Sequence, residues 1–268
     1  MNLFHAFLLG ILQGLTEFIP VSSTAHLLIG QTLLGLPAND AMFAFLVIVQ
    51  LGTLVSLFIL YWKDLLTIAQ ATLNFRSPTP ARNLGLYLII ATIPALLAGY
   101  LLKDAVEALF KTPLLEAAIR LFTAALLLAL AERLTRKNRQ LDSLTWLDAL
   151  LIGLMQIIAI FPGASRSGTT ISGGLFRGFD RPSAARFAFL MSIPVMLAAG
   201  AYELLDVLKL PELASFLPAL ALGFLTAALT GWLAIRWLIN YINKNSLYLF
   251  AAYCAVLGSL CLVFYFQA

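Results

Sequence analysis

Two segments of this chain place polar, helix-breaking residues in the middle of apolar sequence. They cover residues 3–30 and 146–176, and Pro together with Gly, Ser and Thr interrupts each near its middle. Neither half of either segment reaches the roughly 20 residues that span a bilayer. Irregular backbone at membrane depth is tolerated only where it lines a buried site, because unsatisfied backbone groups in hydrocarbon are costly. We therefore interpret both segments as re-entrant helical hairpins.

The rest of the chain has the composition of an integral membrane protein. Of its 268 residues, 61% are hydrophobic and 11% are charged, which leaves too little polar surface for a soluble domain of this size. Long apolar runs without period-2 alternation predict helices rather than a barrel. Six runs are expected to span the bilayer: 41–62, 84–102, 114–131, 187–204, 214–235 and 247–266. The prediction is a single all-α polytopic membrane domain, residues 1–268, with six transmembrane helices and two re-entrant hairpins in contact with membrane lipids.

Basic residues are distributed unevenly over the predicted loops. Twelve Lys and Arg fall on one side of the membrane, and three, Lys103, Lys111 and Lys209, fall on the other. Short cytoplasmic loops retain positive charge, so the side with twelve is predicted to be cytoplasmic. The net charge of +4 is then a loop asymmetry, and no nucleic-acid partner is expected. The first residues lack the pattern of a removable signal peptide, so we expect them to belong to the fold.

The two hairpins begin two halves of similar sequence. An offset of 143 aligns Gly10 with Gly153, Gln13 with Gln156, Phe18 with Phe161 and Ser22 with Ser165. Each half holds one hairpin and three spans, an odd number, so the second half must enter the membrane upside down. We predict an inverted-topology internal repeat, with repeat one at about 1–132 and repeat two at about 144–268, and a polar site near the midplane. Coincidence among apolar residues is the alternative.

The first hairpin gathers groups that suit acid–base and nucleophilic chemistry. In chain order they are Gln13, Glu17, Ser22, Ser23, Thr24 and His26. Gln13 and Glu17 share one helical face, and the helix is expected to end near Pro20. The three hydroxyl residues then begin the next helix, with His26 on the same side as Ser23. A carboxylate deep in a membrane is costly and marks a functional site by default.

The second hairpin supplies the complementary charge. Ile160 aligns with Glu17, and Arg166 aligns with Ser23. The segment after Pro162 predicts a turn followed by a helix N-terminus, where backbone N–H groups, hydroxyls and a guanidinium bind anions. The candidate ligands are Gly163, Ser165, Arg166, Ser167 and Thr169. Phosphate or diphosphate is the expected guest.

Each of these features also has a structural interpretation. His26 could be a packed histidine, the hydroxyls could cap a helix, and Arg166 could simply neutralise Glu17. Arg120 lies within an apolar run, four residues after Glu116, and is expected to pair with that residue or to snorkel. No functional role is assigned to Arg120.

The segments Gln13–His26 and Pro162–Gly168 resemble the undecaprenyl pyrophosphate phosphatase family, also called the bacitracin-resistance protein family, and the similarity covers essentially the whole chain. The resemblance implies a multi-pass enzyme of the bacterial inner membrane that hydrolyses undecaprenyl diphosphate. It would thereby recycle the lipid carrier for peptidoglycan synthesis, cell-wall biogenesis and cell shape, and confer bacitracin resistance. Glu17, Ser23, His26 and Arg166 fall on the family's active-site residues. A homodimer is a further possible arrangement.

Position 13 departs from the family pattern, which often begins with Glu. Two carboxylates would suit Mg²⁺ or Ca²⁺, whereas Glu17 beside the neutral amide of Gln13 would form a weaker, partly hydrated metal site. The divalent cation that the resemblance implies is therefore an open expectation, with Glu17 as its ligand.

Two mechanisms and two further functions remain open at the level of sequence. Ser23 is the preferred nucleophile, with Glu17 or His26 as proton acceptor, and direct attack by a water activated by Glu17 is the alternative. The predicted topology opens the site to the periplasmic side. A flippase or transporter of a prenyl phosphate or small anion is the rival function, because broken helices are common in transporters. A structural subunit is disfavoured by the intramembrane Glu and Arg.

Overall fold

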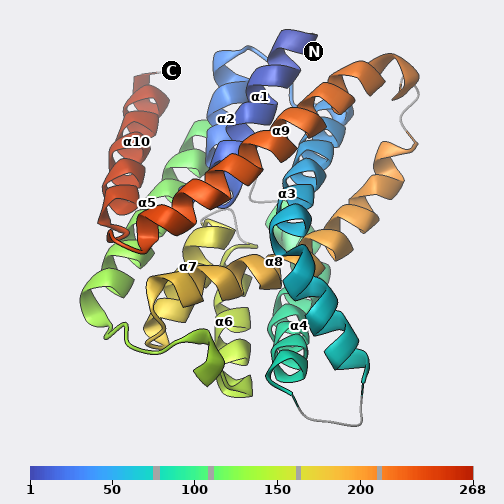
Figure 1. Ribbon diagram of the computed structural model, residues 1–268. Coiled ribbons are helices and arrows are strands. Elements are labelled where there is room, and N and C mark those ends of the chain that lie inside the picture. The colour runs from blue at the N-terminus through green and yellow to red at the C-terminus, as the bar shows by residue number, and fades with distance from the viewer. Residues whose placement is uncertain (75–78, 108–111, 161–163, 210–212, 268) are drawn as a thin grey trace.

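The computed structural model describes residues 1–74, 79–107, 112–160, 164–209 and 213–267 (Figure 1). Its helices are α1 (Leu3–Glu17), α2 (Ser23–Leu33), α3 (Asp40–Leu73), α4 (Pro80–Glu107), α5 (Pro113–Leu134), α6 (Trp146–Ile158), α7 (Arg166–Phe176), α8 (Arg181–Val207), α9 (Leu213–Ile242) and α10 (Tyr248–Gln267), with a 3-10 turn at Leu141–Ser143. No strand occurs within these ranges, which confirms the all-α prediction. The predicted site residue Gly163 lies outside the described residues, as do Phe161 and Pro162.

Six helices are long and apolar enough to cross a bilayer, which confirms the predicted number. They are α3, α4, α5, α8, α9 and α10, and each overlaps one predicted span. The helices exceed the predicted spans because backbone hydrogen bonding continues past the apolar run. In α3 the backbone leaves helical geometry at Tyr61 (φ −107°, ψ 16°), where the apolar run gives way to Lys63 and Asp64.

Each of the two broken segments contains two short helices that contact each other, α1 with α2 and α6 with α7, and these pairs are called the first and second hairpin below. Helices α1 and α2 have 15 and 11 residues, and helices α6 and α7 have 13 and 11. At 1.5 Å per residue the longest measures about 22 Å, which is less than the thickness of the hydrocarbon core. None of these four helices can span alone. That each hairpin leaves by the face it entered remains a prediction.

Glycines allow the first helix of each hairpin to approach a transmembrane helix closely. A Cβ added at Gly10 of α1 would lie 2.7 Å from the carbonyl oxygen of Gly223 in α9. A Cβ at Gly153 of α6 would lie 2.3 Å from the carbonyl oxygen of Ala91 in α4. Such distances are below van der Waals contact, so only glycine fits. This packing explains why both aligned positions carry glycine.

Ion pairs hold the base of the second hairpin together. Asp148, in the first turn of α6, accepts hydrogen bonds from Arg139 Nη2 and from Arg177 Nε just after α7, both at 2.7 Å. Thr145 completes a capping box with the same carboxylate. The start of α6, the end of α7 and the loop that carries Arg139 therefore meet at the buried Asp148 carboxylate. This arrangement anchors the two helices that lead to the start of α7 at Arg166, 18 residues after Asp148.

Candidate anion-binding site

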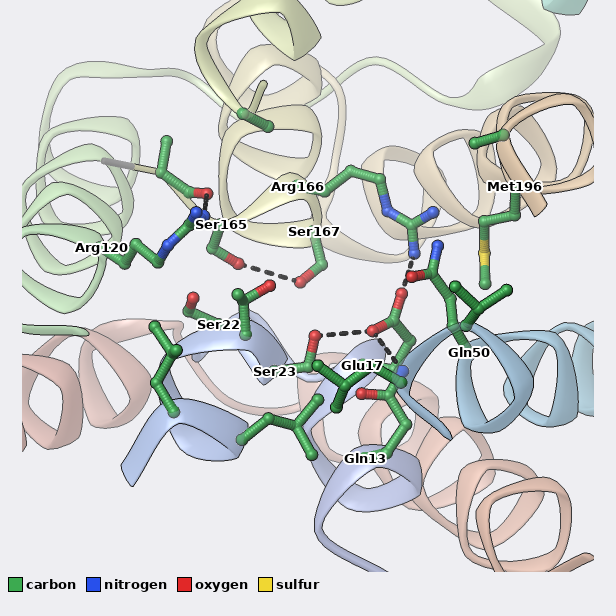
Figure 2. Close-up of a pocket in the computed structure, with 18 of the residues that line it drawn as sticks. Gln13, Glu17, Ser22, Ser23, Gln50, Arg120, Ser165, Arg166, Ser167 and Met196 are labelled. Carbon is green, nitrogen blue, oxygen red and sulfur yellow. Dashed lines mark hydrogen bonds and ion pairs between the residues drawn. The ribbon is translucent and has the colours of Figure 1, made fainter. Parts of the chain in front are cut away.

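A cavity of about 310 Å³ lies where the tips of the two hairpins meet (Figure 2). Ser167 Oγ of α7 donates a hydrogen bond to the Ile19 carbonyl in the turn between α1 and α2, at 3.3 Å. Eight of the predicted site residues line the cavity: Gln13, Glu17, Ser22, Ser23, Thr24, Ser165, Arg166 and Ser167. Apolar side chains of α2, α3 and α8, including Leu28, Phe43 and Met196, form its remaining wall. The cavity thus combines a polar end with a hydrophobic flank.

The Glu17 carboxylate is the centre of the polar end. Its Oε2 accepts hydrogen bonds from Ser23 Oγ at 2.6 Å and from Gln13 Nε2 at 2.9 Å. Its Oε1 pairs with the Arg166 guanidinium of the other hairpin. Glu17 ends α1 and Ser23 begins α2, so the short turn between them brings the acid and the hydroxyl together. Glu17 is only 8% exposed, and its charge is matched by three donors.

Serines at the two helix N-termini add hydroxyls to the same cavity. Ser165 caps α7 by accepting from Gly168 N at 3.2 Å, and its Oγ lies 3.3 Å from Ser167 Oγ. Ser22 caps α2 and has a positive φ of 67°. A non-glycine residue in this region is strained, and such strain is concentrated at functional sites. The turn therefore holds Ser23 in place at a cost in conformational energy.

His26 does not reach the cavity. Its Nδ1 lies 2.8 Å from the Ser22 carbonyl oxygen, and its Nε2 lies 2.7 Å from the hydroxyl of Tyr253 in α10. The two rings are also parallel, with centroids 5.7 Å apart. Both ring nitrogens are thus engaged away from the Glu17 carboxylate. In this geometry His26 supports the turn that carries Ser22 and Ser23.

Thr169 is also separated from the cavity lining. Its Oγ1 donates to the carbonyl oxygens of Ser165 and Arg166 within its own helix, both at 2.9 Å. Its side chain is fully buried. The structure therefore gives Thr169 a role within the first turn of α7.

Arg120 was expected to pair with Glu116 or to snorkel, and Glu116 does attract its guanidinium electrostatically. Snorkelling is wrong, because Arg120 is only 5% exposed and lines the cavity. Its Nη1 lies 3.5 Å from the Ala164 carbonyl oxygen, next to the N-terminus of α7. Gln50 of α3 and Glu203 of α8 also line the cavity and were not predicted. The charge of Arg120 within an apolar span could have marked it as a cavity residue. The sequence offers no comparable indication for Gln50, which is a single neutral amide in a long apolar helix.

The donor set in the cavity does not fit a resident divalent cation. Both Glu17 oxygens already accept from cationic or neutral donors, and Gln13 turns its NH₂ group toward that carboxylate. The Gln13 Oε1 is buried and has no hydrogen-bond partner among the described residues. Within the described part of the chain, no three His, Cys, Asp or Glu side chains gather as a metal cluster. The Mg²⁺ or Ca²⁺ that the family resemblance implies stays a prediction, and the proposed roles of Glu17 and Ser23 use neither ion.

Fold and cavity together define a class: a multi-pass α-helical membrane protein whose buried cavity is formed by two helical hairpins. The family model described as bacitracin resistance protein BacA matches residues 6–260, and the chain belongs to this family.

Curated relatives are similar over nearly their whole length. A protein of Alkaliphilus metalliredigens (strain QYMF) is 40% identical, with 98% of this chain and 99% of the relative covered. A protein of Geotalea daltonii is 38% identical with 98% of each chain covered, and one of Methanobrevibacter smithii is 39% identical with 96% of each covered. All three carry the name undecaprenyl-diphosphatase.

Proposed function

We propose that this chain hydrolyses undecaprenyl diphosphate to undecaprenyl phosphate and phosphate, and so recycles the lipid carrier for peptidoglycan synthesis and confers bacitracin resistance. The observation that carries the proposal is the contact of one buried carboxylate, Glu17, with both a hydroxyl, Ser23 Oγ, and a guanidinium, Arg166. Membership of the BacA family and the name shared by the relatives support the same activity.

Arg166 and the N-terminus of α7 bind the terminal phosphate in this proposal. Backbone N–H groups at a helix N-terminus and a guanidinium both favour phosphate oxygens. The hydroxyls of Ser165 and Ser167 add donors to the same place. Stabilising the charge on the equatorial oxygens is the main demand of phosphoryl transfer.

Ser23 is the nucleophile, and Glu17 accepts its proton. The 2.6 Å hydrogen bond already points from Ser23 Oγ to Glu17 Oε2. In this step the diphosphate contacts Arg166, and Glu17 Oε2 takes the proton from Ser23 Oγ. Ser23 Oγ then bonds to the terminal phosphorus, the bridging P–O bond breaks, and undecaprenyl phosphate leaves. Water hydrolyses the phosphoserine and releases phosphate.

Attack by a water bound to Glu17 uses the same residues without a covalent step. Labelling the terminal phosphate and quenching in acid separates the two: recovery of phosphoserine supports Ser23, and its absence together with an active Ser23→Ala variant supports water. His26 has a positioning role in either case, because its ring nitrogens bond Ser22 and Tyr253.

Phosphate release by purified protein in detergent tests the activity itself. We expect release from undecaprenyl diphosphate by the wild type, loss in Glu17→Gln, and a loss of at least about 100-fold in Arg166→Ala. Ser259→Ala, at an exposed position of α10, is the matched control and should retain the wild-type rate. A folded wild type that binds prenyl phosphate but releases none would instead indicate a carrier.

The proposed location is the bacterial inner membrane, with the cavity open to the periplasmic side. The cavity is lined by the first turns of α3 and the last turns of α8. These ends lie on the side opposite the predicted cytoplasmic loops. The prenyl tail would then lie along the apolar flank that includes Leu28 and Phe43.

A further inference from the structure

Arg120 is a second guanidinium in the cavity and belongs to neither hairpin. It comes from α5, a transmembrane helix, and is 5% exposed. Figure 2 shows it on one side of the Ser165 and Ser167 hydroxyls, with Arg166 on the other. The two serine oxygens lie 3.3 Å apart between the two cations. The result is a row of donors across one wall of the cavity, from α5 through α7.

Burying this arginine is costly for a membrane helix. A buried guanidinium must recover its lost hydration through well-formed contacts. Its Nη1 lies 3.5 Å from the Ala164 carbonyl oxygen, next to the N-terminus of α7. Glu116, one turn earlier, attracts Arg120 electrostatically, but its Oε1 also accepts from Thr112 N at 3.2 Å. The guanidinium also lines the cavity, where a bound anion would contact it.

We propose that Arg120 binds the second phosphate of the diphosphate, the one attached to the prenyl oxygen. This inference rests on the proposed function. The terminal phosphate must lie beside Ser23, Glu17 and Arg166, where the hydroxyl can attack it. The lipid-side phosphate then extends along the serine row toward Arg120. There the guanidinium holds the phosphate that leaves with the lipid and balances the charge that forms on it.

The proposal assigns a specificity to each end of the row. A ligand with one phosphate and no lipid occupies the Arg166 end alone, whereas a diphosphate occupies both ends. Arg120 should therefore contribute to the binding of a diphosphate and contribute little to the binding of inorganic phosphate. A purely structural Arg120, which only ties α5 to the loop before α7, would affect both ligands alike.

Inhibition constants of two ligands test the inference in the purified full-length protein. The probes are a prenyl methylenediphosphonate, which cannot be hydrolysed at its bridge, and inorganic phosphate. For Arg120→Met we expect the inhibition constant of the diphosphonate to rise about 10- to 100-fold, because the ligand loses one charged hydrogen-bonding partner. The constant of inorganic phosphate should change by less than about threefold. Arg120→Lys, which keeps the charge and loses the planar fork, should fall between.

The two ligands are compared within each variant, so partial unfolding cannot imitate the result. Loss of folded protein lowers the rate but leaves an inhibition constant unchanged. If Arg120→Met does not purify, the comparison is made with Arg120→Gln, and binding is measured by calorimetry where the rate is too low. Equal changes for both ligands, or no change for either, would overturn the role of Arg120. A wild type that releases no phosphate would instead overturn the proposed function.

Discussion

At the scale of single residues, Gln13 is the position where this chain departs most clearly from a two-carboxylate site. Its NH₂ group donates to Glu17 at 2.9 Å, and its buried Oε1 has no partner among the described residues. The sequence predicted a neutral amide beside an acid on one helical face. It could not predict that the amide turns its NH₂ group toward Glu17, or that Arg166 of the other hairpin pairs with the second oxygen of that carboxylate.

Replacing Gln13 with Glu should create a stronger site for a divalent cation. The new carboxylate would face Glu17 one helical turn away, and two like charges at that distance favour a bound cation. We expect Gln13→Glu to bind Ca²⁺ or Mg²⁺ at least about tenfold more tightly than the wild type. Calorimetric titration of both proteins with each cation checks this, with Gln13→Asn as the neutral control. Equal affinities in Gln13→Glu and wild type would contradict it.

Tyr253 was not singled out from the sequence, because it lies 227 positions from its partner His26 in an otherwise apolar helix. If His26 positions the turn, removing the Tyr253 hydroxyl should loosen the turn without removing a reacting group. We expect Tyr253→Phe to reduce the rate of phosphate release by less than about tenfold, and Ser23→Ala to reduce it by far more. A complete loss in Tyr253→Phe would instead place His26 in the proton transfer itself.

At the scale of elements, the sequence predicted the two helix breaks because proline, glycine and serine disrupt helices locally. The break before Ser23 and the start of α7 at Arg166 follow from residues within a few positions. The helices that receive the hairpins were not predictable in the same way. Which helix packs against Gly10 or Gly153 depends on contacts between distant parts of the chain, as does the inward position of Arg120.

The glycine contact of the second hairpin can be tested by adding a single methyl group. In Gly153→Ala the new Cβ would meet the Ala91 carbonyl oxygen, so α6 must move away from α4. We expect a loss of about 1–3 kcal/mol in the free energy of unfolding. The matched control is Gly99→Ala in α4, where a Cβ would meet no atom within 4 Å. That control should be neutral or more stable by up to about 1 kcal/mol.

Thermal or denaturant unfolding in detergent measures both glycine variants. The same variants link the hairpin to the site, because α6 leads to the tip that carries Arg166. Gly153→Ala should therefore also lower phosphate release, and Gly99→Ala should not. Similar stabilities for the two variants would show that α6 can shift without cost.

At the scale of the whole molecule, the two halves exchange contacts. Helix α1 packs against α9, α6 packs against α4, and α5 packs against α10. The first helix of each hairpin thus lies against the second span of the opposite half. The exchange is reciprocal between the two halves, which is the relation that the predicted inverted repeat would produce. The 143-residue offset indicated the duplication from sequence. It could not predict which helices of the two halves pack together, because that depends on contacts between distant parts of the chain.

The direction in which the cavity opens can be measured with cysteine reporters in intact cells. Thr32 lies on the exposed face of α2, next to the cavity residue Gln31, whereas Thr67 lies on the exposed end of α3 beyond Tyr61. The native Cys254 and Cys261 are buried, so their background reaction should be low. Because α2 ends on the side with few basic residues, a membrane-impermeant thiol reagent should modify Thr32→Cys in intact cells. Thr67→Cys should react only after permeabilisation, and the reverse pattern would place the cavity mouth in the cytoplasm.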